Sequence, residues 1–122
     1  MSPEGGLTWT VYDADNMTQA EIYGFVLSEL GKINPKIVGL SADLAKSTKI
    51  GKFGEKFPDR FFNFGIAEQN MFGVAAGLAK AGLLPFISTF SVFASMRAVE
   101  FLRTDICYQN LNVKVIATHG GT

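Results

Sequence analysis

The feature that most constrains this chain is a regular alternation of short apolar runs with longer segments of helical periodicity. Strands are predicted at residues 36–40, 60–64, 84–89 and 113–118. Helices are predicted between them, at residues 18–32, 66–81 and 91–108. This order is typical of α/β folds, so we expect a mainly parallel sheet sandwiched by helices.

Local signals set the ends of these elements. Thr18 and Glu21 have the spacing of a capping box at the start of the first helix. Residues 41–58 are polar and contain glycines and lysines, which predicts a long loop. The last helix is predicted from an apolar stripe whose members are three or four residues apart: Val92, Met96, Val99, Leu102 and Ile106.

The length of 122 residues predicts one domain. Residues 1–16 show no hydrophobic period and are expected to form an N-terminal arm, so the domain spans residues 17–122. The last predicted strand runs into a glycine pair without a covering helix. Because parallel sheets need helices on both faces, we expect a domain truncated at its C-terminal end.

Composition narrows the functional classes. Eleven basic residues balance eleven acidic ones without blocks of like charge, which argues against nucleic-acid or anionic-membrane binding. No apolar run reaches the roughly 18 residues that a membrane span needs, and the N-terminus does not resemble a signal peptide. Cys107, the single cysteine, cannot form an internal disulfide, which favours a cytoplasmic location.

Chemistry is expected where the strands end, because parallel sheets bind ligands beyond the carboxyl ends of their strands. Asp43 follows the first strand, Glu68 the second, Phe90 and Phe93 the third, and His119 the fourth. A flat apolar wall beside a carboxyl group suits a planar heteroaromatic ring with a basic nitrogen. No cluster of metal ligands and no phosphate-binding glycine loop is present in the sequence, so no metal site is predicted in this chain.

Three sequence motifs carry a family resemblance. Residues 59–103, which include GIAEQ at 65–69, resemble the pyrimidine-binding domain of transketolase and its thiamine diphosphate-dependent relatives. Residues 41–44 (SADL) and 117–121 (ATHGG) are similar to the same domain. The resemblance is greatest to the separate C-terminal subunit of split transketolases, cut short, and it implies the thiamine diphosphate-binding fold.

The resemblance implies roles for the residues at the cofactor. A glutamate at the position of Glu68 hydrogen-bonds N1′ of the aminopyrimidine and is the catalytic residue. Phe90 and Phe93 match aromatic residues that stack on the pyrimidine, and Asp43 matches an aspartate near the thiamine. The alternatives are that Glu68 is a helix-start acid favoured by the dipole, and that both phenylalanines are ordinary core.

The resemblance also implies two residues that bind the sugar-phosphate substrate. Ser47 matches a serine that touches the phosphate, and His119 a histidine that lines the substrate channel. A solvated loop serine and a strand-end histidine are the alternatives. Two positions depart from the family: Met96 replaces an aromatic residue, and Gln19 and Ala20 stand where relatives place an arginine.

The implied activity is transfer of a two-carbon ketol unit between sugar phosphates, as in the pentose phosphate pathway. The diphosphate and Mg²⁺ would be held by a separate diphosphate-binding domain or subunit, in a homodimer or heterotetramer, so the isolated chain is expected to be inactive. Two alternatives stay open. The chain resembles 1-deoxyxylulose-5-phosphate synthase as well, and a non-catalytic assembly module would keep the same fold.

Overall fold

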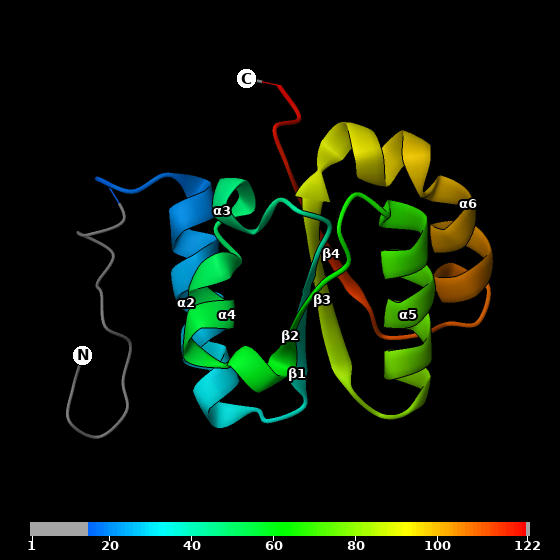
Figure 1. Cartoon of the computed structure of the whole chain (residues 1–122), viewed down its shortest axis with the longest axis horizontal. Helices are drawn as coiled ribbons and strands as arrows, with labels where there is room; N and C mark the ends of the chain where they lie inside the picture. Colours follow the sequence, from blue (N-terminus) through cyan, green and yellow to red (C-terminus); the bar gives the residue numbers. More distant parts are fainter. Residues whose placement is uncertain (1–14, 122) are drawn as a thin grey trace.

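The computed structural model of the chain describes residues 15–121, so most of the predicted N-terminal arm lies outside the described residues. Its centre is a four-stranded parallel sheet with the strand order β2-β1-β3-β4 (Figure 1). The strands are β1 (Ile37–Ser41), β2 (Phe61–Asn63), β3 (Leu84–Phe90) and β4 (Lys114–Thr118).

The register aligns apolar residues across the two central strands. Leu40 of β1 pairs with Ile87 of β3, and Ile87 pairs with Val115 of β4. Leu40 and Ile87 are fully buried. Helices cover both faces of central strands in such sheets, which explains why these strands are near-continuous apolar runs in the sequence.

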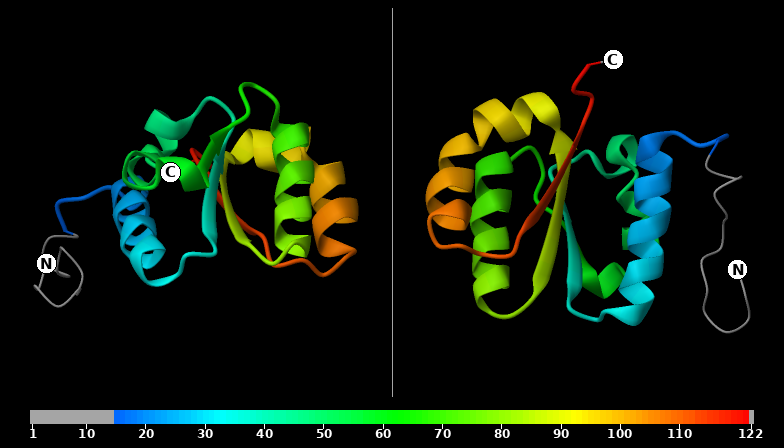
Figure 2. Two further views of the ribbon diagram at one scale, coloured as in Figure 1. Left: turned by 60° about the horizontal axis from the view of Figure 1, so that its bottom comes forward. Right: turned by 180° about the vertical axis from the view of Figure 1, so that it is seen from behind.

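Helices form a layer on each side of the sheet (Figures 1 and 2). On one side lie α2 (Gln19–Ile33), α3 (Ala45–Thr48) and α4 (Gly51–Lys56). On the other lie α5 (Glu68–Lys80), α6 (Val99–Phe101) and the π-helical segments η2 (Phe93–Arg97) and η3 (Leu102–Cys107). The predicted α/β sandwich is confirmed. Within residues 15–121, no helix is long and apolar enough to cross a membrane.

The predicted start of α2 is confirmed in detail. The Thr18 main-chain N–H donates to the Glu21 carboxylate over 2.8 Å, and the Glu21 N–H donates to the Thr18 hydroxyl over 3.2 Å. Both halves of the capping box are therefore formed. The first turn of α2 lies at the carboxyl edge of the sheet, because Thr18, Gln19 and Ala20 line a hollow together with Thr118 at the end of β4.

The prediction of a long loop at residues 41–58 is wrong. This segment contains α3 and α4, followed by a short 3₁₀ helix, η1 (Pro58–Arg60). Ile50 and Phe53 are fully buried and belong to the core that includes Leu27 of α2 and Ile37 of β1. Two buried apolar residues are enough to hold such short helices against the sheet. The polar residues around them leave no hydrophobic period by which a helix could be predicted.

The prediction of one regular helix at residues 91–108 is also wrong. Ala98 N–H donates to the Phe93 carbonyl and Tyr108 N–H to the Arg103 carbonyl, which are the five-residue steps of a π-helix. These wide turns rotate the buried face away from the predicted stripe. Among the described residues the segment buries Ala94, Ala98 and Ile106, whereas three of the five residues of the apolar stripe are exposed: Val92, Met96 and Val99.

Candidate cofactor and substrate site

The predicted site residues come together at the carboxyl edge of the sheet, on segments that follow the four strands. Asp43 and His119, just beyond β1 and β4, both have a left-handed backbone, with φ values of 61° and 59°. Non-glycine residues rarely adopt this conformation, and it occurs at ligand sites more often than elsewhere. The chain therefore turns sharply at both positions.

The first of two hollows at this edge, which we call the Glu68 hollow, has a volume of about 360 Å³. Glu68 is the first residue of α5, and its side chain is only 3% exposed. Gly65 turns the chain ahead of it with a φ of 70°. A carboxylate at a helix N-terminus is favoured by the helix dipole. The hollow is lined by Ala42, Asp43, Leu44, Ile66, Glu68, Phe93 and Arg97.

Arg97 is the charge partner of Glu68. Its Nη1 atom lies 3.4 Å from both carboxylate oxygens. The guanidinium carbon lies 4.0 Å above the centre of the Phe93 ring, a cation–π contact. Arg97 was not predicted from the sequence as a site residue. The available signal was its position four residues after Phe93, a spacing that brings side chains together on a helix.

Aromatic rings connect this hollow to the far end of the edge. The Phe93 and Phe90 rings are stacked, with centroids 5.8 Å apart and an angle of 22° between their planes. The Phe90 ring in turn contacts the imidazole of His119, with centroids 4.3 Å apart. Phe90 therefore lies between Phe93 and His119 and joins the segments that follow β3 and β4.

Asn63, the last residue of β2, is a second site residue that the sequence analysis missed. Its side-chain oxygen accepts hydrogen bonds from Asp43 N–H over 2.9 Å and from Gly65 N–H over 3.2 Å. One amide thus fixes the turns that follow β1 and β2. These are the turns that present Asp43 and Glu68 to the same hollow.

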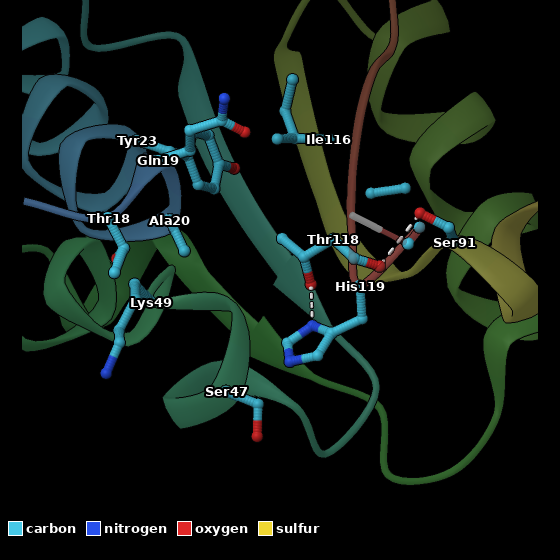
Figure 3. Close-up of a pocket in the computed structure, with 13 residues that line it drawn as sticks. Thr18, Gln19, Ala20, Tyr23, Ser47, Lys49, Ser91, Ile116, Thr118 and His119 are labelled. Carbon is cyan, nitrogen blue, oxygen red and sulfur yellow. Dashed lines mark hydrogen bonds between the residues drawn. The ribbon is translucent and has the colours of Figure 1, made fainter.

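The second hollow, which we call the His119 hollow, is larger, at about 670 Å³ (Figure 3). Ser47 and Lys49 border it from the α3 side and His119 from the end of β4. The His119 Nδ1 atom lies 2.8 Å from the Thr118 hydroxyl oxygen. Five of its lining residues carry a hydroxyl group: Thr18, Tyr23, Ser47, Ser91 and Thr118. The other lining residues are Gln19, Ala20, Lys49, Ile116, Ala117, His119, Gly120 and Gly121.

Tyr23 ties the α2 side of the His119 hollow to the sheet. Its hydroxyl lies 2.6 Å from the hydroxyl of Ser88 on β3. Burial raises the pKa of Tyr23 well above its usual range, although the hydrogen bond to Ser88 opposes this. The phenol is therefore a neutral structural group that holds α2 against the sheet.

The structure places five of the six predicted site residues in two groups. Asp43, Glu68 and Phe93 line the Glu68 hollow, whereas Ser47 and His119 line the His119 hollow. Phe90 lies between them in the aromatic stack. Within residues 15–121, no three His, Cys, Asp or Glu side chains are placed to share a metal ion.

The chain is an α/β domain with a buried carboxylate and an aromatic ring in one hollow at the carboxyl edge of its parallel sheet. Residues 15–122 match the family described as "Transketolase, pyrimidine binding domain". The chain belongs to this family.

Its relatives include both whole and split enzymes. It is 54% identical over 99 residues to a "Putative transketolase C-terminal section" of Methanocaldococcus jannaschii, covering 81% of this chain and 31% of that protein. It is 38% identical over 104 residues to the 1-deoxy-D-xylulose-5-phosphate synthase of Dictyoglomus turgidum, covering 85% of this chain and 17% of that enzyme.

A solved structure shares the fold at higher identity. It is described as "Split gene transketolase, inactive beta4 tetramer". The match has a TM-score of 0.74 and 63% sequence identity, and it covers 81% of this chain and 33% of the other. The chain thus spans about a third or less of the length of these relatives.

Proposed function

We propose that this chain forms the pyrimidine-binding half of a thiamine diphosphate-dependent transketolase. The assembled enzyme would transfer a two-carbon ketol unit between sugar phosphates, in the cytoplasmic pentose phosphate pathway. One observation carries the proposal: the buried Glu68 carboxylate and the Phe93 ring face the same hollow at the carboxyl edge. A planar ring with a basic nitrogen is the ligand that this pair suits.

The residues present fit the aminopyrimidine ring. The guanidinium of Arg97 is itself a flat group with N–H donors, and it contacts both the Phe93 ring and the Glu68 carboxylate. A flat ligand with a nitrogen at its edge is able to make the same two contacts. The arrangement around Glu68 therefore has the shape and the polarity of a site for such a ring.

The thiamine cofactor, when bound, supplies the carbon that accepts the ketol unit. Glu68 would hold a proton between its carboxyl group and the ring nitrogen N1′, and its burial keeps water from competing for that proton. Phe93 would orient the ring, Phe90 would support Phe93 through the stacked contact, and Asp43 would border the ring as another residue of the hollow.

The sugar-phosphate substrate would bind in the His119 hollow. Ser47 and His119 border this hollow, and Lys49 places a cation at its edge (Figure 3). Hydroxyl, imidazole and ammonium groups suit a polyhydroxylated anion. His119 also touches Phe90, so the substrate position is next to the ring position.

The diphosphate and Mg²⁺ would be held by a partner, a diphosphate-binding domain or subunit in a homodimer or heterotetramer. A similar split-gene transketolase forms a tetramer that its description calls inactive, which supports the need for a second kind of subunit.

A 1-deoxyxylulose-5-phosphate synthase is the second candidate, because the chain is 38% identical to such an enzyme. Greater identity to a transketolase section and to a split-gene transketolase favours ketol transfer. A non-catalytic assembly module would not need the Glu68 carboxylate. Assays of the assembled enzyme with ketose phosphate donors and aldose phosphate acceptors separate a transketolase from the other two.

The proposal is tested by Glu68→Gln in the assembled enzyme. Glutamine keeps the size and a hydrogen bond but supplies no proton, so activity should fall by about 10²–10⁴-fold. The melting temperature should change little, because Arg97 is half-exposed and water replaces its partner. Glu100→Gln, at an exposed glutamate that pairs with Arg103, is the matched control. Activity within about threefold of wild type would mean that Glu68 is only a helix-start acid.

A further inference from the structure

The guanidinium of Arg97 makes two contacts at once in the Glu68 hollow. It lies 3.4 Å from both oxygens of the buried Glu68 carboxylate, and its carbon lies 4.0 Å from the centre of the Phe93 ring. The side-chain amide of Gln69 donates to the Arg97 main-chain carbonyl over 3.1 Å. This hydrogen bond holds the backbone of Arg97 at the start of α5, and the long side chain extends from there into the hollow.

The Arg97 guanidinium lies where a ligand ring stacked on Phe93 would lie. Flat groups in contact are separated by about 3.5–4 Å, so a group 4.0 Å from the Phe93 centroid fills the first layer over that ring. The Phe93 ring also stacks on Phe90. A ligand ring therefore cannot stack on the Arg97 side of Phe93 while the guanidinium stays there.

We propose that Arg97 is an internal placeholder that the ligand ring must displace. This inference rests on the proposed function of the Glu68 hollow. A guanidinium resembles an aminopyrimidine, because both are flat and carry N–H donors. The Arg97 side chain is 47% exposed, so it is able to move from the hollow into water. The contacts that it breaks in doing so are those with Glu68 and Phe93.

The placeholder has a physical reason. A buried carboxylate without a partner is costly, and Arg97 supplies that partner while the hollow holds no ring. It also lowers the apparent affinity for the ring, because only the fraction of molecules with Arg97 displaced is able to bind. A cation–π contact of ordinary strength corresponds to a reduction of about three- to sixfold.

The first test observes the displacement directly in the complete chain by NMR. The Phe93 ring current should move the Arg97 δ-proton resonances upfield, and Phe93→Leu should abolish that shift. Titration with 4-amino-2-methylpyrimidine, at millimolar concentrations, should return these resonances to ordinary positions. Resonances of Glu68 should change over the same concentration range.

The second test uses charge-matched variants. Arg97→Ala should bind 4-amino-2-methylpyrimidine about three- to sixfold more tightly than wild type. Arg103→Ala removes an exposed arginine that pairs with Glu100, and it should bind the probe as wild type does. Unchanged or weaker binding by Arg97→Ala would overturn the placeholder.

The outcomes separate this inference from the proposed function. If the probe perturbs Glu68 and Phe93 while the Arg97 resonances stay upfield, the ring site stands and the placeholder is wrong. If saturating probe perturbs neither Glu68 nor Phe93, the ring site is wrong and the placeholder falls with it. If the Arg97 resonances of the wild type show no ring-current shift, the cation–π contact itself is wrong.

Discussion

At the scale of single residues, Phe93 differs in its surroundings from the phenylalanines of the core. It is only half-buried, and it packs on Phe90 on one side and on Arg97 on the other. Phe72 of α5, by contrast, is fully buried in the core between α5 and the sheet. The two phenylalanines should therefore respond differently to truncation.

Phe93→Ala should lower the free energy of unfolding by about 1 kcal/mol, because it removes a half-exposed aromatic contact. Phe72→Ala should cost about 3–5 kcal/mol, as fully buried aromatics do. In the assembled enzyme, Phe93→Ala should also weaken cofactor binding measured by calorimetry. Equal losses of stability in urea titrations, with unchanged cofactor affinity, would assign Phe93 to the core.

Tyr23 predicts a pH dependence of stability. Its folded-state pKa is raised above the unfolded value of about 10, so the folded state retains a proton that the unfolded state loses. The associated stability is complete below pH 10 and is lost as the pH rises above it, with a limiting slope of about 1.4 kcal/mol per pH unit.

The measurement compares urea unfolding between pH 9 and 11 for wild type and Tyr23→Phe. The variant should be less stable at pH 9 because Ser88 loses its partner, and its stability should fall less steeply with pH. Tyr108→Phe, at an exposed tyrosine, is the matched control. Parallel curves for wild type and Tyr23→Phe would contradict the burial of the phenol.

Several site residues could be predicted from the sequence, and others could not. Glu68 and Phe93 lie within five residues of the ends of β2 and β3, and a parallel sheet brings the ends of its strands to one edge. Arg97 and Asn63 act through partners brought near by tertiary structure: Glu68 lies 29 residues from Arg97, and Asp43 lies 20 residues from Asn63. Single-sequence periodicity carries no information on such pairs.

At the scale of elements, periodicity predicted α2, α5 and the four strands because each is long enough or apolar enough to show its pattern. It missed α3 and α4, which have four and six residues and no complete apolar stripe. It misplaced the buried face of η2, α6 and η3 because the pattern assumes 3.6 residues per turn and π-helical turns are wider.

Close approach of elements at glycine gives a stability prediction. A Cβ atom at Gly24 of α2 would lie 2.4 Å from the main-chain oxygen of Lys49, which has no side-chain torsion to rotate. A Cβ at Gly77 of α5 would meet no described atom within 4 Å. Gly24→Ala should therefore destabilise the fold by about 1–3 kcal/mol, whereas Gly77→Ala should stabilise it by about 0.5–1 kcal/mol.

Urea unfolding of both variants provides the measurement. The expected changes have opposite signs although the chemical change is the same, so helix propensity alone does not account for them. Stabilisation by both substitutions would show that α2 does not pack closely on the segment between α3 and α4.

At the scale of the whole molecule, large apolar side chains are exposed on the segments around the Glu68 hollow. Ile66, on the turn before α5, is 78% exposed and borders the Glu68 hollow. Val92, Met96 and Val99 are exposed on the segment that follows β3. Apolar groups exposed around a hollow are typical of interaction surfaces.

We therefore expect the isolated chain to self-associate through this edge. Ile66→Lys should shift the chain toward monomer, because a charge at that position opposes burial in an interface. Ile33→Lys is a closely matched control: Ile33 is also 78% exposed, but it lies at the last turn of α2, toward the opposite edge of the sheet. Sedimentation velocity over a range of concentrations measures the effect. Wild type and Ile33→Lys should sediment faster as concentration rises, whereas Ile66→Lys should sediment as a monomer throughout. A wild-type chain that stays monomeric, or equal effects of the two substitutions, would show that this edge does not hold chains together.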